Sequence, residues 1–187
     1  IIFPENRKNY EKFEGIQLYP VFFKNDQEIP NVEQLDMNFP CFTTHPRSIF
    51  NFRDMTTEQR KQYEDAFSSK ITSVIEEFCP DIVHAQHIWT LAGISATCCQ
   101  KYNIPLIITC HGTDLMGIND EIKRGENWGT NWSNLAINYA DFIVTISKDS
   151  NQLAESTFPE AQNKTIWIRN GVDNHVFSMD KSIDKSK

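Results

Sequence analysis

Histidines gather at the ends of short apolar segments from Pro80 onward in this chain. His84 and His87 stand in one such stretch, His111 directly follows another, and His175 comes after a third. A histidine side chain can donate a hydrogen bond, accept one or carry a charge near neutral pH. Several histidines at one edge of a protein therefore suit general acid–base chemistry or the binding of a ligand rich in hydroxyl groups.

Strand and helix patterns alternate from Pro80 onward. The predicted strands span residues 81–85, 105–110, 142–146 and 165–168, and the predicted helices span residues 93–102, 131–139 and 148–157, with a polar loop or short helix at 111–129. Such repeats predict an α/β fold, a Rossmann-like parallel sheet with helices on both faces. In this kind of sheet, ligand sites lie just past the carboxyl ends of the strands.

The first part of the chain is less regular. Thr56 and Gln59 have the spacing of a capping box, and apolar residues follow at helical intervals, which predicts a helix over residues 57–78. Before it, we expect two short strands, at residues 1–3 and 16–23, and a long surface connection to about residue 53.

The segment His111-Gly112-Thr113-Asp114 directly follows a fully apolar predicted strand. A glycine lets the backbone approach a ligand closely, while Thr113 and Asp114 offer a hydroxyl and a carboxyl group to a polyol. Capping of a helix by Thr113 or Asp114 is an alternative interpretation that is compatible with ligand binding.

Other polar residues near the strand ends have plain structural interpretations. His84 lies within an apolar strand and is equally consistent with a core side chain. Because His84 and His87 are three apart on that strand, their side chains are expected on opposite faces, and no metal site is predicted. Asn170-Gly171 is typical of a tight turn that needs a positive φ. Cys110 is interpreted as a buried, inert thiol, and Trp128 and Trp132 as core or loop-anchoring residues rather than sugar-stacking platforms.

Composition excludes several classes of protein. With 18 Lys and Arg against 25 Asp and Glu, the net charge of −7 argues against a nucleic-acid partner. No apolar run approaches the roughly 18 residues that a transmembrane segment needs. Only seven glycines occur and none forms a G-x-G-x-x-G loop, which argues against an ordinary dinucleotide-binding dehydrogenase. The five cysteines have no C-x-x-C spacing and favour a reduced, cytoplasmic setting.

Four ordered motifs carry a family resemblance. They are PDIVHAQHIW at residues 80–89, ITCHGTDL at 108–115, ADFIVTIS at 140–147 and NGVD at 170–173, followed by Phe177. Together, over about residues 42–177, they resemble the amino-terminal domain of the GT-B glycosyltransferases of family 4. These enzymes transfer a sugar from a nucleotide-sugar with retained configuration, in a cleft between two Rossmann-like domains.

The resemblance implies that this chain is the acceptor-binding half, with a small-molecule or glycan acceptor and a nucleotide-sugar donor held by a second domain. It implies no metal and no cofactor, since the nucleotide-sugar is a substrate. By carry-over, His111 is the catalytic residue and Asn170 and Gly171 form a turn at the cleft. The carried-over acceptor-binding residues are His84, His87, Trp89, Gly93, Gly112, Thr113 and Asp114.

The chain also departs from the family pattern. The family's first strand with its glycine-rich loop and its carboxyl-terminal E-x7-E motif do not occur, and Arg169 replaces a common proline. We therefore expect one domain over residues 1–178 without its first strand, a linker or tail at 179–187, and no activity of this portion alone. A freestanding, non-catalytic α/β binding module and a GT-B-like epimerase fragment remain alternatives. Contact with the inner face of a membrane also stays open, because some family members act on lipid-linked acceptors.

Overall fold

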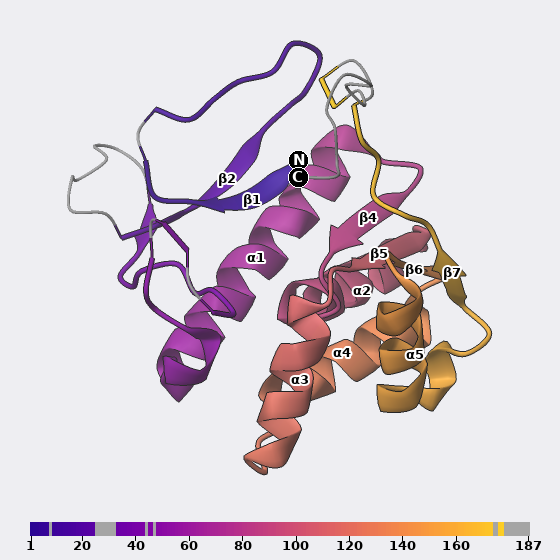
Figure 1. Cartoon of the computed structure of the whole chain (residues 1–187). Coiled ribbons are helices and arrows are strands. Elements are labelled where there is room, and N and C mark those ends of the chain that lie inside the picture. The colour runs from indigo at the N-terminus through magenta and orange to yellow at the C-terminus, as the bar shows by residue number, and fades with distance from the viewer. Residues whose placement is uncertain (8, 25–32, 44, 47, 174–175, 178–187) are drawn as a thin grey trace, which may run out of the picture.

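The computed structural model describes residues 1–7, 9–24, 33–43, 45–46, 48–173 and 176–177 (Figure 1). Its strands run parallel to their neighbours and helices flank them, so the predicted α/β class is confirmed. His175 and the predicted tail at 179–187 lie outside the described residues, and the domain limit at residue 178 stays a prediction.

A small parallel sheet comes first in the chain. It contains β1 (Ile2–Glu5), β2 (Tyr19–Phe23) and β3 (Gln34–Leu35), in that order. The two predicted strands are thus joined by a third, and the connection that follows ends in the 3-10 helix η1 (Phe52–Asp54). Val21 and Phe23 are buried, so this sheet contributes one face to the core.

Helix α1 (Thr57–Phe78) has the predicted bounds and the predicted capping box. The Thr56 hydroxyl accepts from the Gln59 amide at 3.2 Å, and the Gln59 side chain accepts from the Thr56 amide at 2.9 Å. Four buried side chains, Tyr63, Phe67, Ile71 and Ile75, form the apolar stripe. Tyr63 and Phe67 pack against Phe23 of the first sheet, which joins helix and sheet in one core.

The second sheet contains the four predicted strands in chain order, β4 (Val83–Gln86), β5 (Leu106–Cys110), β6 (Phe142–Thr145) and β7 (Thr165–Trp167). Helix α2 (Thr90–Tyr102) joins β4 to β5, and α5 (Lys148–Thr157) with the 3-10 helix η2 (Pro159–Ala161) joins β6 to β7. Among the described residues no strand of the first sheet pairs with a strand of the second, so the strands form two parallel sheets rather than one.

Two helices occupy the connection from β5 to β6. They are α3 (Thr113–Lys123), the short helix allowed by the sequence, and α4 (Trp128–Tyr139), which begins before its predicted start at residue 131. The buried carboxyl group of Glu121 accepts from the amides of Gly129 at 2.9 Å and Thr130 at 2.7 Å. Glu121 on α3 thus supplies the cap that the sequence around residue 128 lacks.

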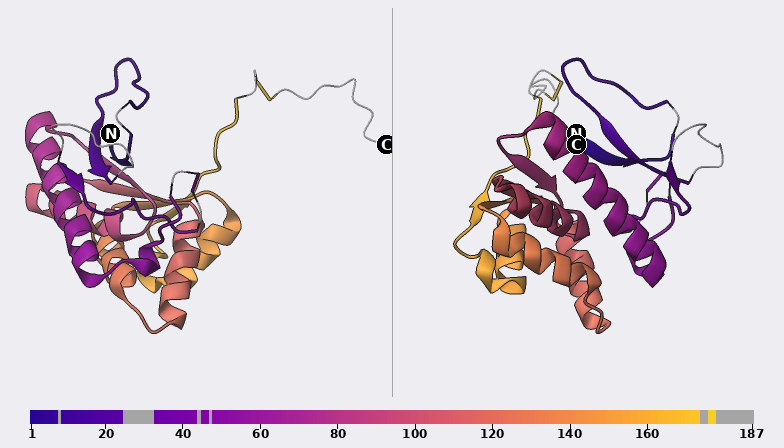
Figure 2. Two further views of the ribbon diagram at one scale, coloured as in Figure 1. Left: turned by 90° about the vertical axis from the view of Figure 1, so that its left-hand side faces the viewer. Right: turned by 180° about the vertical axis from the view of Figure 1, so that it is seen from behind.

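The helices pack against one face of the four-stranded sheet. On that face Ala85, Ile108 and Ile143 are buried, and these three residues are partners in register. On the opposite face Phe142 is 49% exposed and Ile166 is 41% exposed. The left view of Figure 2 shows α3, α4 and α5 below this sheet and α1 along its side. The described helices therefore leave the other face open, whereas the sequence predicted helices on both faces.

A helix that crosses a bilayer must be both long and apolar. Within the described ranges, none combines the length and the apolar composition that a membrane span requires.

Candidate functional site

The carboxyl ends of β4 and β5 bring three polar side chains into one hydrogen-bonded row, the histidine row of His84, Gln86 and His111. Nε2 of His111 lies 2.7 Å from Oε1 of Gln86, and Nε2 of Gln86 lies 3.2 Å from Nε2 of His84. Nε2 of His84 is also 2.8 Å from the hydroxyl oxygen of Thr109. Gln86 and Thr109 are partners in register on neighbouring strands, which explains why side chains 25 residues apart in the sequence meet.

His87 is the first residue after β4 and lies beside the histidine row. Its backbone has a φ of 69°, in the left-handed region that few side chains adopt. The imidazole ring lies against that of His111, with centroids 4.7 Å apart, and against Phe42 at 5.4 Å. His84, through Gln86, and His87, through its own ring, thus both belong to the surroundings of His111, while the opposite directions expected for their side chains stay a prediction.

Burial and two neighbouring groups act on His87. Its Nδ1 atom is buried, has no hydrogen-bond partner among the described residues, and lies 3.8 Å from the carboxyl group of Asp114. Burial lowers the pKa of His87, Asp114 opposes that change, and the nearby His111 lowers it further. The folded protein therefore favours neutral His87.

This shift predicts a pH dependence of stability. Since the unfolded chain binds a proton on His87 more readily, the free energy of unfolding should fall as the pH drops through the ordinary histidine pKa of about 6.5. Urea unfolding at about pH 7.5 and about pH 5.5 measures this fall. His87→Asn, which tolerates the left-handed backbone, should lose less stability over the same interval. An equal loss in both proteins would contradict the prediction.

Asp114 ties the two histidine-bearing loops together from inside the protein. Its side chain is 0% exposed and accepts hydrogen bonds from the amides of Ile88 at 2.8 Å, Leu115 at 3.0 Å and His111 at 3.2 Å. The sequence suggested that Asp114 contacts a ligand. In the structure it holds the backbone of both loops and does not reach the surface.

Gly112 and Thr113 lie where α3 begins. Gly112 has a φ of 89° and is the residue before the helix, and nothing lies within 4 Å of the position that a Cβ atom would occupy there. Thr113 is exposed. The backbone at Gly112 is therefore open to close approach by a ligand beside His111.

Trp89 and Gly93 lie away from this surface. Trp89 is buried and packs against Phe42, and a Cβ atom at Gly93 would lie 2.3 Å from the carbonyl oxygen of Trp132. Both residues thus hold α2 against its neighbours, and neither is offered to a ligand. Trp132 and Trp128 donate to the same Glu64 oxygen of α1, at 2.9 and 2.6 Å, as expected of anchoring residues.

Asn170 and Gly171 follow β7 and are exposed. Neither has a positive φ, and no turn forms there, so the tight turn expected from this dipeptide is wrong. No described strand follows that would require the chain to reverse.

Cys110 is fully buried, and burial raises the pKa of its thiol, in line with the inert side chain that the sequence predicted.

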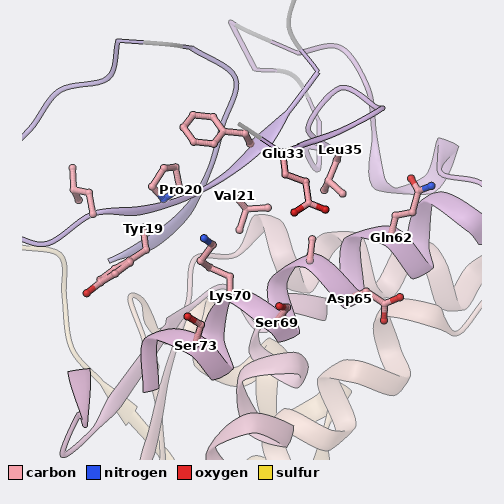
Figure 3. Close-up of a pocket in the computed structure, with 13 residues that line it drawn as sticks. Tyr19, Pro20, Val21, Glu33, Leu35, Gln62, Asp65, Ser69, Lys70 and Ser73 are labelled. Atoms are coloured by element: carbon pink, nitrogen blue, oxygen red, sulfur yellow. The ribbon is translucent and has the colours of Figure 1, made fainter. Parts of the chain in front are cut away.

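A separate groove of about 780 Å³ lies between β2 and α1 (Figure 3). Its lining includes Lys70 and Ser69 of α1 and Tyr19 and Pro20 of β2. It shares no lining residue with the histidine row.

Gln86 is the residue of the histidine row that the sequence analysis did not predict. Its position between His84 and His87, in a motif at the end of a strand, could have indicated it.

Comparison with known proteins assigns the family. The model for Glycosyltransferase Family 4 matches residues 36–176. The chain is 30% identical over 105 residues to an uncharacterized glycosyltransferase of Methanocaldococcus jannaschii, covering 56% of this chain and 27% of that protein. It is 26% identical over 102 residues to a glycogen synthase of Mycobacterium tuberculosis, covering 50% of this chain and 23% of that one.

The chain thus spans about a quarter of the length of the curated relatives it matches. Among solved structures, UDP-N-acetylglucosamine 2-epimerase from Rickettsia bellii aligns with a TM-score of 0.38 and 14% identity, over 79% of this chain and 36% of that chain. The family match covers most of the chain, including both loops of the histidine row and the strands that carry them. The chain belongs to glycosyltransferase family 4.

Proposed function

We propose that this chain is the acceptor-binding, amino-terminal portion of a retaining glycosyltransferase that uses a nucleotide-sugar donor. The observation that carries the proposal is the row His84–Gln86–His111 at the carboxyl edge of the parallel sheet, inside the segment that matches the family. A ligand site at this edge is what an open α/β sheet favours.

The chemistry of the row suits an acceptor with several hydroxyl groups. Imidazole nitrogens and an amide can both donate and accept, and Gly112 leaves its backbone open beside them. In the proposed reaction an acceptor hydroxyl oxygen bonds to the anomeric carbon on the face from which the nucleoside diphosphate departs. The bond from that carbon to the phosphate oxygen breaks, and the hydroxyl proton passes to the departing phosphate oxygen.

His111 would orient the reacting sugar and acceptor, and His84 and His87 would support acceptor binding. Catalysis of this kind depends on positioning rather than on a covalent intermediate with the protein. The donor would be held by a second domain, and the reaction would require no metal and no cofactor. Asp114, Trp89 and Gly93 would act by holding the loops and helices in place.

The isolated chain offers a direct test. With labelled UDP-glucose and GDP-mannose, calorimetry on the 187-residue chain should detect no binding, and no labelled product should form with water or added glycans. The gene product that contains this chain should transfer the label. Tight binding of either nucleotide-sugar by the isolated chain would overturn the division of roles, and conversion of the donor sugar without an acceptor would favour an epimerase.

A further inference from the structure

Gln86 stands between two histidines and contacts both through different atoms. Its amide oxygen faces Nε2 of His111 at 2.7 Å, and its amide nitrogen faces Nε2 of His84 at 3.2 Å. A side-chain amide oxygen only accepts hydrogen bonds and the amide nitrogen only donates them. The two histidines therefore meet opposite requirements at the same ring atom.

These requirements fix where each neutral imidazole carries its hydrogen. His111 must carry it on Nε2 in order to donate to Gln86, which leaves a lone pair on Nδ1. His84 must have its lone pair on Nε2 in order to accept from Gln86, so its hydrogen is on Nδ1. The hydroxyl of Thr109, 2.8 Å from the same Nε2 atom, then also donates to it, so the two donors share one lone pair.

The lone pair of His111 faces solvent rather than protein. Among the described residues Nδ1 of His111 has no hydrogen-bond partner, and it is not one of the buried atoms without one. The other titratable groups around this ring are His84, His87 and Asp114, and Asp114 accepts from the backbone amide of His111 rather than from its ring. Nδ1 is thus the ring atom available to a ligand.

We propose that Gln86 is a positioning residue that holds His111 with its hydrogen on Nε2 and an accepting Nδ1. The site then selects a ligand group that donates a hydrogen bond at that point, such as a sugar hydroxyl, over one that only accepts. This selectivity rests on the proposed function, whereas the proton assignment rests on the geometry alone.

Nitrogen-15 NMR of the imidazole rings tests the assignment without any activity. At about pH 8, where histidines are neutral, His84 should show its hydrogen on Nδ1 and His111 on Nε2. The His84 result is the discriminating one, because a free histidine side chain favours Nε2. His84 with its hydrogen on Nε2, or as a rapidly exchanging mixture, would overturn the proposal.

Two variants test the roles of the oxygen and the nitrogen of the Gln86 amide. Gln86→Glu replaces the donor with a second acceptor, so both rings should carry hydrogen on Nε2. Gln86→Leu removes both contacts and should release His84 to donate to Thr109. The control Gln162→Glu, at an exposed glutamine outside the row, should change neither ring. A well-dispersed amide spectrum identifies folded variants, and an unchanged His84 in folded Gln86→Leu would contradict the proposal.

The same variants distinguish the proton assignment from the proposed function. In the gene product that contains this chain, Gln86→Leu should lower kcat/KM for a hydroxyl acceptor about tenfold, the loss of roughly one hydrogen bond. If the ring nitrogens behave as predicted while transfer is unchanged, the assignment stands and the placement of the acceptor at His111 fails.

Discussion

Replacement of Asp114 by alanine should lower the free energy of unfolding by about 3 kcal/mol or more. Asp114 is fully buried and accepts from the amides of Ile88, His111 and Leu115. Each buried amide left without a partner costs about 1–3 kcal/mol, although water entering the new space would satisfy part of the loss. Urea unfolding monitored by circular dichroism measures the difference between variant and parent.

Two comparisons make the Asp114 result specific. Asp81→Ala changes an exposed aspartate with no hydrogen bond among the described contacts and should leave stability within about 0.5 kcal/mol of the parent. Asp114→Asn keeps one accepting oxygen but turns an N–H group toward the amides, and should fall between the two. A loss below about 1 kcal/mol in Asp114→Ala would show that the loops do not depend on this carboxyl group.

Gly93→Ala should destabilise the chain by about 3 kcal/mol or prevent folding, because α2 and α4 touch through their backbones there. A Cβ atom at residue 93 would lie 2.3 Å from the carbonyl oxygen of Trp132 and 2.8 Å from its Cα atom. Neither atom can rotate away, so the helices must separate along their contact. Overpacking of a well-packed core typically costs about 1–3 kcal/mol and sometimes more, and the gain in helix propensity of about 1 kcal/mol does not offset a shift of two helices.

Gly117→Ala is the matched control for Gly93. Gly117 also lies within a helix, but the nearest atom to its Cβ position is a ring carbon of Phe42 at 3.0 Å, and this ring is half-buried. A small movement of the ring can accommodate the methyl group, so stability should stay within about 1 kcal/mol of the parent. Equal effects of the two substitutions in thermal unfolding would contradict the close backbone contact at Gly93.

Local signals in the sequence accounted for most of the secondary structure. The capping box at Thr56 and the apolar stripe through Phe67 and Ile71 predicted α1 to the residue, because both depend on side chains within a few turns. The four strands of the second sheet were recognisable as short apolar runs, although five of their eight boundaries differed by one or two residues.

Long-range contacts explain what the sequence did not reveal. The start of α4 depends on Glu121, a residue of the preceding helix, and the inward direction of Asp114 depends on an amide at Ile88. Gly93 was read as part of a ligand loop because its role is a contact with Trp132, 39 positions later along the chain. The meeting of His87 with His111 required a left-handed backbone at a histidine, which no pattern of residue types predicts.

The sequence therefore predicted the location of the candidate site but not the role of each residue in it. The rule that ligands bind past the carboxyl ends of parallel strands selected His84 and His111 correctly as neighbours of one edge. It did not separate residues that face a ligand from residues that hold the loops. Side-chain directions and burial place Gln86 in the histidine row. They place Asp114 and Gly93 among the residues that hold the loops and helices.

Transfer of labelled sugar by the gene product that contains this chain tests the central claim most directly. His111→Ala should lower kcat/KM by about a hundredfold or more, because His111 is proposed to orient the reacting groups. The exposed Gln162→Ala should leave transfer unchanged, and both variants should unfold at the same urea concentration as the parent. Full transfer activity in folded His111→Ala would contradict the assignment of this edge as the active site.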